Sequence, residues 1–148
     1  MNKIFDAGEK LFFNILIICL VSWIYFNILP MNKATLITGF VLCVLYFGMY
    51  FYIGYKYNFT LVEAFIVGII GCGIGIFLYF FSLYTDLVLQ NVNSAIWIIK
   101  PYFIPTMSMI KLFTIEVTIA YPFFLMIFNI FLVILGSISK KIMNKLSS

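Results

Sequence analysis

Four long apolar stretches constrain the fold of this 148-residue chain more than any other feature of it. They cover residues 11–29, 34–55, 61–82 and 117–138. A helix needs about 20 apolar residues to cross the hydrocarbon layer of a bilayer, and no stretch carries a charge in its central turns. The sequence therefore predicts an all-α fold, an integral membrane four-helix bundle that forms one transmembrane domain over residues 1–148.

Composition supports a protein dissolved in lipid. Hydrophobic residues make up 65% of the chain and charged residues 9%, against about half and a quarter in soluble domains. The positive side chains are all lysines, which are scattered along the chain and lie at the ends of the predicted helices. This arrangement argues against a nucleic-acid surface, so the lipid bilayer is the first predicted partner.

The lysines also predict an orientation. If the N-terminus is cytoplasmic, the inner segments hold Lys3, Lys10, Lys56, Lys140, Lys141 and Lys145. The outer segments then hold Lys33, Lys100 and Lys111. This excess of inner lysines follows the positive-inside rule, and it predicts a multi-pass protein of the cell membrane with both termini in the cytoplasm. Aromatic clusters near the span ends, including Tyr50 in the second span, are interpreted as lipid anchors.

The segment between the third and fourth stretches predicts an amphipathic helix over residues 86–100. Its apolar residues recur at helical spacing, with Asp86, Gln90, Trp97 and Lys100 on the polar side. We expect this helix to lie in the headgroup layer with its apolar face toward lipid and to stop at Pro101. Alternatively, residues 87–105 re-enter or cross the bilayer.

Small residues line one side of the third stretch and predict a helix-contact surface. The stripe consists of Ala64, Gly68, Gly71 and Gly75, with Cys72 beside it. In lipid, small residues let helix backbones approach closely and gain van der Waals contact. The stripe therefore packs inside this bundle or against another subunit. A GxxxG-type pattern is common in membrane helices, and it does not select between these alternatives.

Two polar residues near the last stretch are candidates for lining a pathway for ions or small solutes. Glu116 is expected to open this span, and Asn129 is its deepest amide. A buried amide needs a partner, so we expect Asn129 to bond to a neighbouring helix. Glu63, in contrast, follows Thr60 at capping-box spacing and is predicted to cap the third helix.

The sequence carries no recognisable catalytic constellation. Histidine is absent, and the cysteines Cys19, Cys43 and Cys72 lie in three different stretches without a Cys-x-x-Cys pair. They could form a sulfur-rich site for a soft metal only if all three faced inward, and packing is the plainer interpretation. No catalytic residue, metal or cofactor is predicted.

The function expected from these features is non-enzymatic. We expect a small accessory, assembly or immunity-type membrane protein that acts by helix–helix or partner contact, with a membrane-protein partner or as a homo-oligomer. The alternative is an oligomeric channel or transporter for ions or small solutes, lined by Asn129 and Glu116. A thiol- or metal-dependent membrane enzyme is the third possibility.

Overall fold

The computed structural model describes residues 2–146, in which the regular secondary structure is all helical and no strand occurs. The elements in chain order are α1 (Asn2–Ile28), α2 (Lys33–Tyr57), α3 (Leu61–Gly71), α4 (Gly73–Leu87), α5 (Val92–Phe103), the 3₁₀ turn η1 (Ile104–Thr106), α6 (Met107–Leu112) and α7 (Ala120–Leu146). The prediction of an all-α chain is confirmed.

Three of these helices are long and apolar enough to cross a membrane: α1, α2 and α7. A fourth crossing is available if α3 and α4 together form one span, and these two helices meet at an angle of 59°. The prediction of one regular helix over residues 61–82 is therefore wrong. Gly71 and Gly73 flank the break at Cys72, and glycine is among the poorest helix formers.

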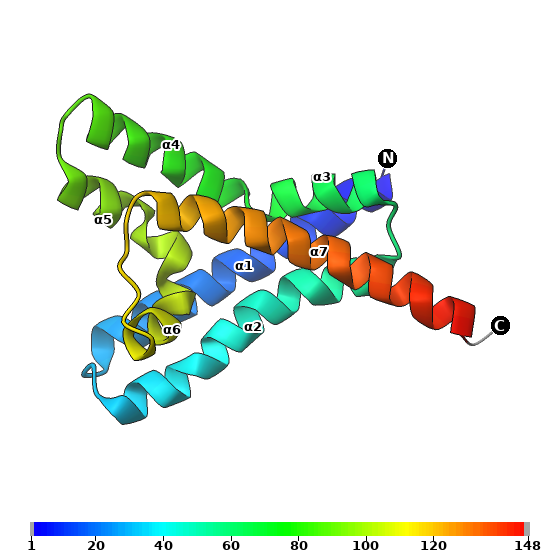
Figure 1. Ribbon diagram of the computed structural model, residues 1–148, viewed down its shortest axis with the longest axis horizontal. Helices are drawn as coiled ribbons and strands as arrows, with labels where there is room; N and C mark the ends of the chain where they lie inside the picture. Colours follow the sequence, from blue (N-terminus) through cyan, green and yellow to red (C-terminus); the bar gives the residue numbers. More distant parts are fainter. Residues whose placement is uncertain (1, 147–148) are drawn as a thin grey trace.

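The long helices form a bundle from which α4 and α5 project together as an arm (Figure 1). In the bundle α2 packs along α7, and α1 packs along α3. The beginning of α1 and the end of α7 lie at the same end of the molecule, and the connections α1–α2 and α4–α5 lie at the opposite end (Figure 1). The last turn of α7 extends beyond its neighbours.

The segment predicted as a surface helix has a different structure. Residues 86 and 87 belong to the last turn of α4, and α5 begins only at Val92, capped by the side chain of Asn91, which accepts from the Ser94 amide at 3.0 Å. Pro101 lies inside α5 rather than ending it. Proline has no amide hydrogen to donate to the preceding turn, and the helix continues for only two more residues before η1 begins.

The apolar face of α5 does not face lipid, contrary to the expectation. It packs on α4, where the Ser82 hydroxyl donates to the carbonyl of Ala95 at 2.8 Å, and Ala95 and Ile99 are buried. The following residues turn back through η1, and α6 packs against α2 rather than leading into the last span. That span begins at Ala120, three residues later than predicted.

Apolar side chains cover most of the exterior. Large residues such as Phe124, at 65% exposed, point outward along the helices. Polar groups instead occur in the core, where Tyr46, Tyr50, Tyr102 and Asn129 are fully buried. A lipid-facing surface and a partly polar interior are what a membrane solvent favours, because buried polar groups then find partners inside the protein.

The tightest backbone approach joins α2 to α7. A Cβ atom added at Gly54 would overlap the carbonyl group of Val133, and one added at Gly136 would overlap the backbone of Phe51. The Ser137 hydroxyl also donates to the Gly54 carbonyl at 3.1 Å. Glycine is required here because the two helices touch through their backbones.

Candidate functional site

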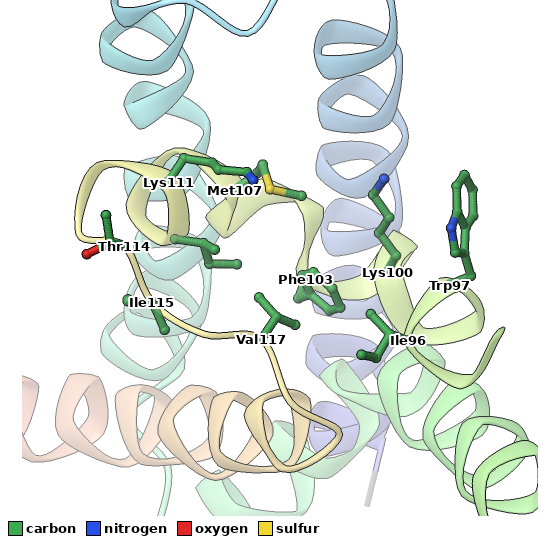
Figure 2. Close-up of a pocket in the computed structure, with 10 residues that line it drawn as sticks. Ile96, Trp97, Lys100, Phe103, Met107, Lys111, Thr114, Ile115 and Val117 are labelled. Atoms are coloured by element: carbon green, nitrogen blue, oxygen red, sulfur yellow. The ribbon is translucent and has the colours of Figure 1, made fainter. Parts of the chain in front are cut away.

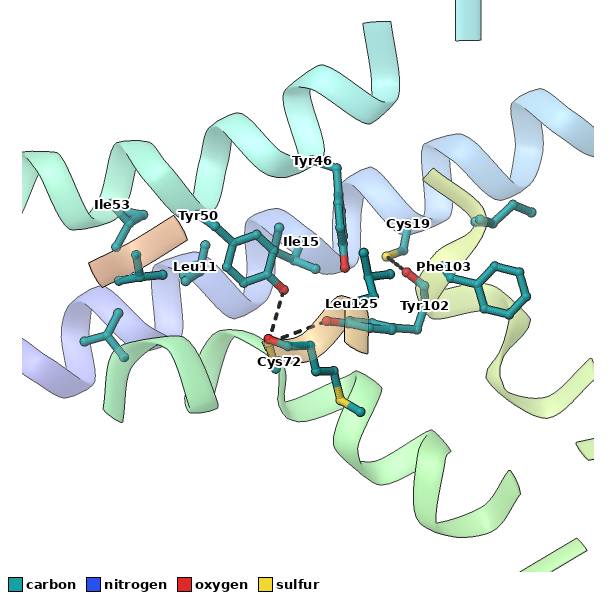
Figure 3. Packing of buried hydrophobic residues seen from close by; sticks show 14 of the residues in the cluster. Leu11, Ile15, Cys19, Tyr46, Tyr50, Ile53, Cys72, Tyr102, Phe103 and Leu125 are labelled. Atoms are coloured by element: carbon teal, nitrogen blue, oxygen red, sulfur yellow. Dashed lines mark hydrogen bonds between the residues drawn. The ribbon is translucent and has the colours of Figure 1, made fainter. Parts of the chain in front are cut away.

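The break between α3 and α4 places Cys72 at the centre of the buried core. Its amide donates to the carbonyl of Gly68 at 3.0 Å, and its own carbonyl accepts from the Ile76 amide at 2.9 Å. The chain thus keeps its backbone hydrogen bonds on both sides of the bend. The Cys72 side chain is wholly buried and points toward tyrosines from α2 and α5 (Figure 3).

These side chains and one amide form a single hydrogen-bonded group, which we call the tyrosine–asparagine cluster: Tyr46, Tyr50, Cys72, Tyr102 and Asn129. The Asn129 amide nitrogen donates to the hydroxyls of Tyr46 at 2.8 Å and Tyr102 at 2.9 Å. Tyr102 donates to the Cys72 sulfur at 3.5 Å. Tyr50 donates to the carbonyl of Gly71 at 3.3 Å. The cluster joins α2, the α3–α4 break, α5 and α7.

The prediction that Asn129 bonds to neighbouring helices is confirmed. Its amide oxygen, however, has no partner among residues 2–146. An amide has donors on one side and an acceptor on the other, so facing two hydroxyls leaves one of its polar atoms without a bond in either orientation. The cluster holds the four elements in register, and it contains no carboxylate or cation that could move a proton.

The three cysteines do not converge. The thiol of Cys19 faces the carbonyl of Tyr102 at 3.7 Å, whereas that of Cys72 lies against Tyr50 and Met126. Cys43 is buried elsewhere on α2. Within residues 2–146 no three Cys, Asp or Glu side chains are placed to hold a metal ion.

The predicted small-residue stripe lies against other parts of the same chain. Ala64 is fully buried. A Cβ atom at Gly68 would come 3.1 Å from Ile130, one at Gly71 would come 2.5 Å from Leu11, and one at Gly75 would come 2.6 Å from the ring of Tyr102. The stripe is occupied by α1, α5 and α7, so a second subunit would need a different surface.

The two pathway candidates are in different surroundings. Asn129 is fully buried in the cluster. Glu116 lies on the exposed segment between α6 and α7, because α7 begins four residues after it. The expectation that Glu116 opens the last span is therefore wrong, and no shared surface brings the carboxylate and the amide together.

The residues predicted to lie on one surface helix belong to different parts of the structure. Asp86 is half-buried in α4, and Gln90 is exposed in the α4–α5 connection with a φ of 51°. Trp97 and Lys100 stay together on α5, where the lysine nitrogen lies 4.6 Å from the centre of the indole ring. They contribute to a pocket between α5, α6 and the segment that follows α6 (Figure 2).

Sequence reasoning missed the buried tyrosines and placed Tyr50 among lipid anchors, which is wrong because it is fully buried. A signal was present on α2. Apart from Ile53, its buried residues are small or polar and recur at steps of three and four: Thr35, Gly39, Cys43, Tyr46, Tyr50 and Gly54. Read as one stripe, this pattern predicts a face turned toward other helices. Tyr102, in contrast, has no such periodic signal.

Comparison with known proteins adds no further constraint. No protein-family model, no curated protein and no solved structure matches this chain.

Proposed function

We propose that the chain crosses the membrane four times, through α1, α2, the bent α3–α4 pair and α7, with both termini in the cytoplasm. The lysine distribution supports this topology. Lys3 and Lys10 at the start of α1, Lys56 at the end of α2 and the lysines near the end of α7 belong to helix ends that lie together (Figure 1). The positive-inside rule assigns this end to the cytoplasm.

Within this topology, the protein acts without catalysis, by contact with another membrane protein, as an accessory, assembly or immunity-type subunit. One observation carries the proposal: the α4–α5 arm presents an aromatic face that no other part of the described chain covers. Phe77, Phe80, Phe81 and Tyr84 are between 52% and 67% exposed along α4. The opposite face of α4 is occupied by α5.

The shape of the arm favours a protein partner. α4 bends away from α3 by 59°, and its exposed side chains Phe80, Phe81 and Tyr84 surround a shallow depression of about 330 Å³. Helix association in lipid depends on van der Waals packing, since lipid tails are as apolar as the side chains. Rigid rings around a hollow offer more such contact to a helix than to mobile acyl chains. The small-residue stripe cannot be the surface that contacts a partner, because other helices of the same chain cover it.

Site-specific photo-crosslinking in native membranes tests this proposal. A photoreactive phenylalanine analogue replaces Phe80 or Phe81 in α4, and in the matched control it replaces Phe124 of α7, which is 65% exposed against 67% for Phe80. We expect a discrete protein adduct from α4 and only lipid adducts from Phe124. Absence of an α4 adduct, or the same adduct from all three positions, would contradict the proposal.

The transport alternative has weaker support. Its two proposed lining residues lie apart, and Asn129 is engaged with two tyrosine hydroxyls in a packed core. A conduit would then have to form between copies of the chain. Reconstituted protein should show no ion flux in liposomes; a flux altered by Asn129→Leu would favour transport.

A further inference from the structure

A second surface, independent of the arm, has the properties of a ligand site. A pocket of about 500 Å³ lies between α5, α6 and the segment joining α6 to α7 (Figure 2). This volume is in the range of ligand sites, about 300–1,000 Å³. We call it the basic pocket. Its lining comprises Ile96, Trp97, Lys100, Phe103, Met107, Ile110, Lys111, Thr114, Ile115 and Val117.

The charge in the basic pocket is entirely positive. Lys100 and Lys111 are eleven positions apart in sequence, and the reversal of the chain through η1 brings both to one pocket. None of the lining residues is acidic, and neither lysine has a carboxylate within ion-pair distance among residues 2–146. Two cations that share a pocket without a counter-ion favour an anionic ligand.

The rest of the wall is apolar. Phe103, Met107 and Ile110 are buried residues that line the pocket. Ile115 and Val117 line it from the connecting segment (Figure 2). A small hydrated anion would leave this wall unused. A ligand with a charged group and an attached hydrocarbon fits both parts of the pocket, because each finds a matching surface.

The wall formed by the connecting segment is held in a defined conformation. Thr114 has a φ of 50°, and the amide of Ile115 donates to the carbonyl of Ile110 at 2.9 Å, which closes the end of α6 as in a Schellman motif. Glycine usually occupies the left-handed position, and a β-branched residue there is uncommon. The hydrogen bond fixes Ile115 over the pocket despite this conformation.

The pocket lies toward the end of the molecule that the proposed topology places at the outer surface of the membrane (Figure 1). With about 1.5 Å per residue, the 27-residue α1 extends about 40 Å, more than the roughly 30 Å of hydrocarbon. Its far end, the α1–α2 connection, is at the same end of the molecule as α6 (Figure 1). The exposed ring of Trp97 beside Lys100 is also typical of a membrane–water interface.

We propose that the basic pocket binds the headgroup of an anionic phospholipid. Lys100 and Lys111 contact the phosphate, while the glycerol and the first carbons of one acyl chain lie against Phe103, Ile115 and Val117. The inference does not depend on the partner proposed for the α4–α5 arm, because the arm's aromatic face and the basic pocket share no residue. The bound lipid would contact α5, α6 and the segment that joins α6 to α7.

Thermal unfolding of the detergent-purified protein tests this proposal. Phosphatidylglycerol or phosphatidylcholine with matched acyl chains is titrated, and inorganic phosphate is titrated separately. We expect phosphatidylglycerol to stabilise the protein at lower concentration than phosphatidylcholine. Each lysine should contribute about a fivefold preference for phosphatidylglycerol over phosphatidylcholine. The double variant Lys100→Gln with Lys111→Gln should therefore lower this preference by about 25-fold.

Lys33→Gln is the matched control, because Lys33 is an exposed lysine near the same end of the molecule that does not line the pocket. It should keep the preference for phosphatidylglycerol, as should the charge-conserving pair Lys100→Arg and Lys111→Arg. A second readout is the emission of Trp97 in a Trp23→Phe background, which should change on lipid addition only while the lysines are present.

Three results would overturn the proposal. The first is an equal response of the parent protein to the two lipids. The second is a preference that survives the double glutamine variant or is lost with Lys33→Gln. The third is full stabilisation by inorganic phosphate alone, which would assign the pocket to a soluble anion rather than to a lipid.

Discussion

Replacing Gly54 by alanine should separate the two helices that contact each other most closely. An added Cβ at this position would lie 2.9 Å from the carbonyl carbon of Val133 and closer still to its oxygen. Carbon atoms prefer a separation of about 3.5–4.0 Å, so the carbon contact alone would move α2 and α7 apart by about 1 Å, and the closer oxygen requires more. The obstacle is backbone, and no side-chain rotation can relieve it.

The expected loss of stability follows from this displacement. A gap of 0.5–1 Å removes about a quarter to a half of the attraction of each contact it opens, and overpacking a well-packed core typically costs about 1–3 kcal/mol. The Ser137 hydroxyl would also lose its 3.1 Å bond to the Gly54 carbonyl. We expect Gly54→Ala to lower the free energy of unfolding by about 3 kcal/mol.

Gly48→Ala is the internal control. Gly48 lies on the same helix, and an added Cβ there meets no atom within 4 Å. Alanine is the better helix former by about 0.8–1.0 kcal/mol, so this variant should be as stable as the parent or slightly more so. Unfolding in a denaturing-detergent titration, followed by tryptophan fluorescence, measures both. If Gly54→Ala were as stable as Gly48→Ala, the close approach of α2 and α7 would be refuted.

Two further substitutions test the core and a helix start. Asn129→Leu leaves the hydroxyls of Tyr46 and Tyr102 without the amide that now donates to both, and it should destabilise the protein by about 1–3 kcal/mol; an unchanged unfolding midpoint would show that the cluster contributes no net stability. Thr60→Ala removes the acceptor of the 3.3 Å bond from the Glu63 amide and should cost about 1 kcal/mol in the same titration; Thr60→Ser, which keeps the hydroxyl, should retain stability.

Local features of the fold could be predicted because their causes are local. The capping box of Thr60 and Glu63 is present as predicted, with both hydrogen bonds. A buried amide at Asn129 was expected to find a partner on another helix, and it does. In each case the requirement is a property of one residue or one turn.

Features that depend on the path of the chain were not predictable in the same way. In the sequence, Gly71 and Gly73 are compatible both with a packing surface on one helix and with a helix break. The break is decided by the packing of α4 against α5. Likewise, the apolar side of α5 could contact either lipid or another helix. In the structure it contacts α4, which bends at Cys72 and packs against it. Amphipathicity defines a face without defining its neighbour.

The sequence by itself determined the all-helical class of this protein and which of its stretches are long and apolar enough to cross a membrane, because both follow from runs of apolar residues along the chain. It also set which residue types could approach a neighbouring backbone. The tertiary structure alone decided that Gly54 and Gly136 make the closest approach, that Tyr46 and Tyr102 meet Asn129, and that Lys100 and Lys111 line one pocket. Each of these pairings joins residues from different elements, and their distance is fixed only after the helices pack.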